Sequence, residues 1–205
     1  MKNVLALFLL AAVFWFLIFS PWTYHWLNFW VKILIASGVL AFSGLWVSRK
    51  NLWWLHTFRP RYILVGIGSA LLLYLIFWMG NSVSTAIFAS AQPQIASIYG
   101  NKTQASPLLI ALSLLLVIGP AEEIFWRGFV QGSLSSRLGD RKGYLYTAVA
   151  YAAIHIWAFN SILLAAALIC GLFWGAMFMH YKSVWPSLMS HSVWDLAVFV
   201  LFPFQ

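Results

Sequence analysis

The sequence predicts an all-α membrane protein, a polytopic transmembrane helix bundle of about seven membrane helices. Of its 205 residues, 63% are hydrophobic and only 8% are charged, whereas soluble domains average about 25% charged residues. The apolar residues form runs close to the length of about 20 residues that spans a bilayer as a helix. Aromatic residues reach 19%, with 13 Trp, and Trp and Tyr favour the two membrane interfaces. Together these observations indicate that lipid surrounds the chain.

Seven apolar segments are candidate membrane helices. They cover roughly residues 4–20, 27–48, 62–80, 107–131, 144–159, 162–180 and 184–202. The first resembles a signal peptide but lacks a small-x-small cleavage site, so we expect a retained helix. The more polar stretch 81–106 is expected to be a loop or a re-entrant segment. No linker or repeat divides the chain, which predicts one membrane domain over 1–205, with N-terminal helices and a loop in 1–106 and the site-bearing helices in 107–205.

Positive charge is concentrated in alternate loops. With seven helices, nine Lys and Arg residues fall on one side and Lys102 alone falls on the other; the nine are Lys2, Arg49, Lys50, Arg59, Arg61, Arg137, Arg141, Lys142 and Lys182. Because short cytoplasmic loops are rich in Lys and Arg, we expect a multi-pass protein of the cell membrane with a cytoplasmic N-terminus. The net charge of +8 therefore reflects topology and contact with the lipid bilayer, and no nucleic-acid partner is expected.

The chain has only four acidic residues, Glu122, Glu123, Asp140 and Asp195. Asp140 lies in the basic loop after the fourth helix, where a solvated charge explains it. The other three lie within predicted membrane helices, where a charge at the helix centre costs about 2.5–3.5 kcal/mol. An ionisable residue at such a depth is read by default as part of a functional site.

The two adjacent glutamates have different predicted roles. Glu123 and Arg127 are four residues apart on one helix, so they share a face and can form an ion pair. Glu122 is rotated by about 100° from Glu123 and lacks that partner. A desolvated carboxylate without a cation is suited to act as a general base. Pro120 also removes a backbone donor and favours a kink nearby.

Two of the histidines, His155 and His191, lie inside predicted membrane helices. Asp195 follows His191 by four residues and can orient its imidazole. Glu122 and His155 lie roughly 20 and 18 Å from the same membrane face at about 1.5 Å per residue, so both can line one cavity with His191 and Asp195 and converge on a shared water.

The single cysteine, Cys170, permits no internal disulfide and is expected to be a packing residue.

These residues resemble the motifs of the CPBP family, also called Abi, which contains the type II CAAX prenyl endopeptidases and bacteriocin-processing or immunity proteins. Glu122, Glu123 and Arg127 match its Glu-Glu-x-x-x-Arg motif, and His191 with Asp195 match its final His-x-x-x-Asn or Asp. Its middle motif is usually Phe-x-x-x-His and reads Tyr151-x-x-x-His155 in this sequence. The resemblance covers about the last 100 residues.

The resemblance implies an intramembrane endopeptidase that acts on a membrane-associated protein or peptide. Glu122 and His155 would activate a water, and His191 with Asp195 would stabilise the oxyanion, while Glu123 and Arg127 would be structural or orienting residues. A carboxylate cannot donate a hydrogen bond, so Asp195 would have to be protonated or would only orient His191. The substrate, and whether it is prenylated, does not follow from the resemblance.

Other interpretations remain open at this point. A metalloprotease would bind Zn²⁺ through Glu122 or Glu123, His155 and His191. The sequence contains no His-Glu-x-x-His motif, so the metal-free glutamate mechanism, without a cofactor, is preferred. A proton-coupled transporter would also need buried Glu, His and Asp, although no internal repeat is present. A catalytically silent membrane immunity or scaffold protein is a third possibility.

Overall fold

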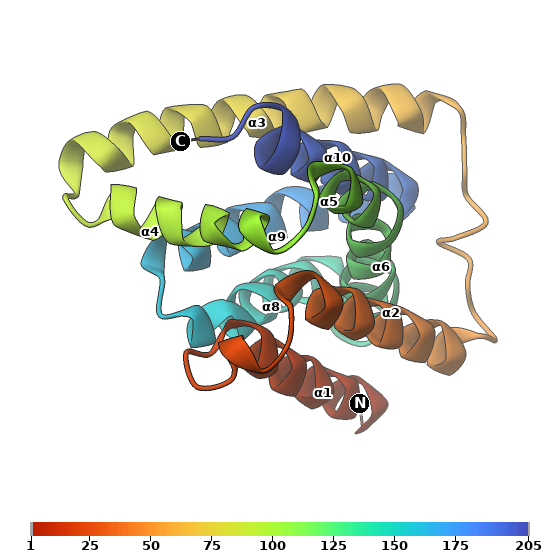
Figure 1. Ribbon diagram of the computed structural model, residues 1–205. Coiled ribbons are helices and arrows are strands. Elements are labelled where there is room, and N and C mark those ends of the chain that lie inside the picture. Colours follow the sequence, from red (N-terminus) through yellow and green to blue (C-terminus); the bar gives the residue numbers. More distant parts are fainter. Residues whose placement is uncertain (1, 205) are drawn as a thin grey trace.

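The computed structural model describes residues 2–204, which form a helical bundle without β-strands in that range (Figure 1). Three long helices make up the N-terminal half: α1 (Lys2–Phe19), α2 (Phe29–Ser48) and α3 (Arg61–Ile87). α1 and α2 pack side by side, and α3 runs along the opposite edge of the bundle (Figure 1). The prediction of an all-α polytopic bundle is confirmed.

The fourth predicted helix is one continuous helical run from Pro107 to Leu138 that changes its winding along its length. It consists of α5 (Pro107–Ser113), a π-helical turn (Leu114–Ile118), α6 (Gly119–Glu123), a second π-helical stretch (Ile124–Gln131) and α7 (Gly132–Leu138). The rest of the C-terminal half contains α8 (Asp140–Ala153), a 3₁₀ turn (Ile154–Ala158), α9 (Ser161–Tyr181), α10 (Trp185–Leu196) and a final π-helical turn (Ala197–Leu201).

The stretch 81–106, expected to be a loop or a re-entrant segment, is mostly helical and therefore not a loop. α3 continues to Ile87, and α4 (Ala91–Tyr99) with a 3₁₀ turn (Gly100–Gln104) follows. α4 buries Ala91, Ile95 and Tyr99, which are spaced four residues apart and so share one face. The polar residues between them obscured this pattern. α4 folds back beside α3 and reaches α9 (Figure 1).

Five helical stretches are long and apolar enough to cross a membrane: α1, α2, α3, the run 107–138, and α9. The other two predicted spans are shorter helices. α8 has 14 residues and begins with charged residues, and α10 has 12 residues before the chain changes to π-helical winding. The chain is therefore a multi-pass membrane protein, and the exact number of seven spans stays a prediction.

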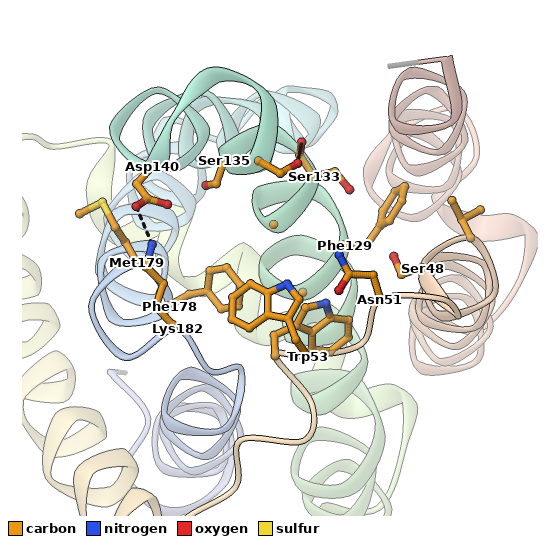
Figure 2. Close-up of a pocket in the computed structure, with 15 residues that line it drawn as sticks. Ser48, Asn51, Trp53, Phe129, Ser133, Ser135, Asp140, Phe178, Met179 and Lys182 are labelled. Atoms are coloured by element: carbon orange, nitrogen blue, oxygen red, sulfur yellow. Dashed lines mark hydrogen bonds and ion pairs between the residues drawn. The ribbon is translucent and has the colours of Figure 1, made fainter.

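The loops predicted to share a membrane side lie at one end of the bundle. Asp140, at the start of α8, pairs with Lys182 after α9 at 2.6 Å. Both border a pocket of about 330 Å³ that Ser48, the last residue of α2, and Asn51 also line (Figure 2). Asp140 is thus the first residue of α8 and not part of a loop, while its side chain is half-exposed, as the predicted solvated charge requires, and pairs with a cation.

The N-terminal helices share one apolar core with the C-terminal half. Ala11 and Trp15 of α1, Leu40 of α2 and Val198 near the C-terminus belong to the same buried cluster. The end of α1 is fixed by Lys32 of α2, whose buried ammonium donates to four carbonyl oxygens, those of Leu17, Ile18, Thr23 and Tyr24. A cation is favourable at a helix C-terminus, so this contact fixes the position of α1 in the bundle.

Candidate functional site

The two adjacent glutamates stand at the end of α6, between the two π-helical stretches. The backbone N–H of Gly119 donates to the carbonyl of Leu114, five residues earlier, and Pro120 has no N–H to give. The i to i+5 pattern is the bond of a π-helical turn, and such turns are frequent at functional sites. The irregular winding therefore coincides with the motif that carries Glu122 and Glu123.

Glu123 belongs to a chain of ionisable side chains that we call the ionic cluster. The Arg127 Nε lies 3.3 Å from Glu123 Oε2, and the His191 Nδ1 lies 3.0 Å from Glu123 Oε1. The other ring nitrogen of His191, Nε2, lies 3.4 Å from Asp195 Oδ2. The predicted Glu123–Arg127 pair is confirmed, and so is the shared face of His191 and Asp195. The ionic cluster therefore consists of Glu123, Arg127, His191 and Asp195.

The ionic cluster is electrically neutral when His191 carries two ring protons. The guanidinium of Arg127 and an imidazolium at His191 then balance the carboxylates of Glu123 and Asp195. The contact between His191 and Glu123 did not follow from the sequence, because the two residues lie 68 positions apart and no spacing rule relates α6 to α10.

Trp174 of α9 covers one side of the ionic cluster. Its ring stacks on His191 with centroids 3.7 Å apart and planes at 17°, and the Arg127 guanidinium lies 6.0 Å from the Trp174 ring. The indole Nε1 donates to Ser190 Oγ at 3.2 Å. An aromatic face attracts cations, so the Trp174 ring is a suitable neighbour for the Arg127 guanidinium. Sequence reasoning missed Trp174 because it is one of 13 Trp in the chain and lies in an apolar helix.

Glu122 belongs to a second set, which we call the hydrogen-bonded cluster. The Tyr151 hydroxyl donates to Glu122 Oε2 at 3.0 Å. The Nδ1 of His155 lies 2.8 Å from the Tyr151 carbonyl oxygen, and the Trp15 Nε1–H donates to His155 Nε2 at 3.0 Å. The hydrogen-bonded cluster therefore consists of Glu122, Tyr151, His155 and Trp15.

The partners of His155 fix its tautomer. A carbonyl oxygen can only accept and an indole N–H can only donate. Nδ1 of His155 must therefore carry the proton, and the lone pair of Nε2 must receive the Trp15 N–H. Both ring nitrogens are thus occupied by protein groups. Trp15 comes from α1, far outside the motifs, and the sequence offered no indication of its role.

One apolar cavity of about 640 Å³ joins the two clusters. Glu122, His155, His191 and Asp195 all line it, as predicted, while Glu123 and Arg127 do not. Its remaining walls come mainly from apolar residues of α2, α3, α4, α9 and α10, including Cys170. Over residues 2–204, Glu122 Oε1 has no hydrogen-bond partner, so this oxygen is left for a molecule in the cavity.

The donor set does not fit a zinc ion. Over the described range, no group of three or more His, Cys, Asp or Glu side chains is arranged to hold a metal. The lone pair of His155 Nε2 is taken by Trp15, and Glu123 is held by Arg127 and His191. Of the three predicted zinc ligands, Glu122 keeps an unoccupied oxygen, but His155 Nε2 and both ring nitrogens of His191 have protein partners, so we derive no step through a metal.

Fold and site together define a multi-pass membrane protein with a buried acid–base centre in an apolar cavity, an arrangement suited to an intramembrane hydrolase. Residues 104–197 match the family described as Type II CAAX prenyl endopeptidase Rce1-like. This segment is just under half of the chain and holds all three motifs, so the match supports the predicted resemblance to the CAAX protease family. Searches of curated proteins and of solved structures found no match. α1, α2 and α3 lie outside the matched segment, so Trp15 does too.

Proposed function

We propose that the protein is an intramembrane endopeptidase that hydrolyses a peptide bond of a membrane-associated protein or peptide by a metal-free glutamate mechanism. The observation that supports this proposal is the different surroundings of the two carboxylate oxygens of Glu122. One oxygen is held by Tyr151 and the other opens onto the cavity that His191 and Asp195 also line. A carboxylate with one unoccupied oxygen beside a possible oxyanion donor is the minimum that peptide hydrolysis needs.

Glu122 acts as the general base in this proposal. Its Oε1 takes a proton from a water while the water oxygen forms a bond to the carbonyl carbon of the scissile peptide. The π electron pair of that carbonyl moves to its oxygen and gives a tetrahedral oxyanion. Glu122 then gives the proton to the leaving nitrogen as the C–N bond breaks and the carbonyl re-forms.

His191 stabilises the oxyanion in this proposal. Its Nδ1–H is directed to Glu123, so only Nε2 can face the substrate, and Nε2 donates only when His191 is an imidazolium. Asp195, 3.4 Å from that nitrogen, orients the ring and balances its charge. In this proposal Asp195 needs no proton of its own.

His155 reaches the same water only after Trp15 releases Nε2. In the arrangement observed, its lone pair is taken by the indole N–H. The proposed contribution of His155 to water activation therefore requires that the Trp15 indole release Nε2 when substrate binds, and Glu122 is the only base until then.

The substrate is expected to reach the site through the apolar walls that α3, α4 and α9 contribute, as a hydrophobic or lipid-anchored segment. The loops that carry most Lys and Arg lie at the end of the bundle where Asp140 meets Lys182 (Figure 2). By the positive-inside rule, we propose that this end and the N-terminus are cytoplasmic.

The test is cleavage of membrane-anchored fluorogenic peptides by the purified protein in liposomes. We expect cleavage by the wild type and none by Glu122→Gln. The matched control is Asp140→Asn, an acidic residue outside the cavity, which is expected to retain activity. Proton flux without cleavage would contradict the protease and favour a transporter, and absence of both would favour a silent scaffold.

Cys170 gives an independent measure of the same cavity. It is the only cysteine in the chain and lines the cavity with the candidate catalytic residues. A membrane-permeant maleimide is expected to inhibit the wild type, a bound substrate peptide is expected to slow the inhibition, and Cys170→Ala is expected to be resistant. Labelling of Cys170 without loss of cleavage would place the reaction elsewhere.

A further inference from the structure

Tyr151 connects the residues of the hydrogen-bonded cluster. Its hydroxyl donates to Glu122, and its carbonyl accepts from His155. The Arg127 guanidinium lies 5.0 Å from the centre of its ring, and the residue is only 5% exposed. One residue thus contacts both groups assigned to the water and also the cation of the ionic cluster.

The contact on Glu122 has a specific geometric consequence. Within residues 2–204, the Tyr151 hydroxyl is the one protein donor to this carboxylate, and Arg127 instead pairs with Glu123. A hydrogen bond from a phenol to a carboxylate restrains the rotation of the carboxylate about its last bond. With Oε2 held, Oε1 stays directed to the cavity.

We propose that the Tyr151 hydroxyl is a positioning group for the reaction, which holds Glu122 so that Oε1 receives the proton of the water. The inference rests on the proposed function. It concerns a feature of this chain in particular, since the aromatic position of the motif is usually Phe, which has no hydroxyl. Tyr151 does not have to touch the substrate to act in this way, because it acts through Glu122.

The test is Tyr151→Phe, assayed in the same liposomes as the wild type. Phe keeps the ring and its contacts with Arg127 and removes only the donor. We expect kcat to fall about tenfold, roughly the size of one hydrogen bond to a charged group, while KM stays unchanged and the thermal midpoint falls only modestly because the buried Glu122 carboxylate loses this donor. Tyr146→Phe is the matched control, because Tyr146 is on the same helix and is exposed; its kcat is expected to equal that of the wild type.

A rescue separates positioning from packing. Replacing Tyr151 by 4-aminophenylalanine restores an N–H donor at the same place and is expected to recover most of kcat. If Tyr151→Phe keeps or exceeds the wild-type kcat, the inference is wrong. It is also wrong if the 4-aminophenylalanine protein is folded but no faster than Tyr151→Phe. The proposed function fails in a different way, through absence of cleavage by the wild type or full cleavage by Glu122→Gln.

Discussion

Glu122 and Glu123 are neighbours in the chain and have opposite surroundings. Glu123 is fully buried between Arg127 and His191, and both of its oxygens have a partner that is or can be charged. Glu122 touches a phenol on one oxygen and the cavity on the other. The same helix therefore presents one carboxylate to the ionic cluster and the next to the hydrogen-bonded cluster.

The partner of a buried carboxylate determines whether that carboxylate can accept and release a proton. Cationic neighbours stabilise the charge of Glu123, and moving a proton onto it would leave Arg127 without its counter-charge. Glu122 has no such neighbour, so it can accept and release a proton without unbalancing a pair. A rotation of about 100° between successive helix positions is enough to separate a structural carboxylate from a reactive one.

The largest expected effect is the loss of activity on substitution of Glu122. Glu122→Gln should lower kcat/KM by about 10²- to 10⁴-fold, the usual contribution of a general base. Its free energy of unfolding should change little, because the Gln carbonyl can still accept from Tyr151. Activity is measured by peptide cleavage in liposomes and stability by thermal unfolding in detergent. An active Glu122→Gln protein would remove the distinction between the two glutamates.

The next largest expected effect is the loss of stability on substitution of Glu123. Glu123→Gln leaves the buried guanidinium of Arg127 without an anion, and we expect the free energy of unfolding to fall by about 3–5 kcal/mol, seen as a lower denaturation midpoint in detergent. The double variant Glu123→Gln with Arg127→Met removes both charges and should recover part of the loss. If the double variant is no more stable than Glu123→Gln alone, the unpaired charge of Arg127 is not the cause of the lost stability.

Sequence patterns predicted the parts of this site that lie within one helix. The Glu123–Arg127 pair and the common face of His191 and Asp195 follow from a spacing of four residues, and the structure has both. Apolar run lengths likewise predicted α1, α2, α3 and α9 to within a few residues at most ends; α3 was the exception, ending at Ile87.

Contacts between helices could not be predicted, because no periodicity determines which helices become neighbours. The bond from His191 to Glu123 and the bond from Trp15 to His155 link residues 68 and 140 positions apart. The α4 helix was missed for a different reason. Its buried face has only three residues among polar ones, and an apolar-run criterion does not detect so short a pattern.

Substitutions at His191 and Asp195, which line the same cavity as Glu122, are expected to have a smaller effect. His191→Gln should lower kcat by about 10²- to 10³-fold, as loss of an oxyanion donor does. Asp195→Asn should stay within about tenfold of the wild type, because the amide can orient the ring and can itself donate. Steady-state kinetics on one peptide decide both. A loss at Asp195→Asn as large as that at His191→Gln would show that the charge of Asp195, and not its position, is required.

The smallest expected effect is the loss of stability on substitution of Trp15, the member of the hydrogen-bonded cluster that lies outside the matched segment. Trp15→Phe removes the N–H and leaves His155 Nε2 without a donor, so stability should fall by about 1 kcal/mol. kcat should not fall, since His155 must lose this bond before it can approach the water. Trp22→Phe, at an exposed indole, is the control for loss of a tryptophan near α1. A tenfold lower kcat for Trp15→Phe at unchanged KM would mean that the tautomer fixed by Trp15 is itself required for catalysis, and the bond from Trp15 to His155 would then have to persist during the reaction.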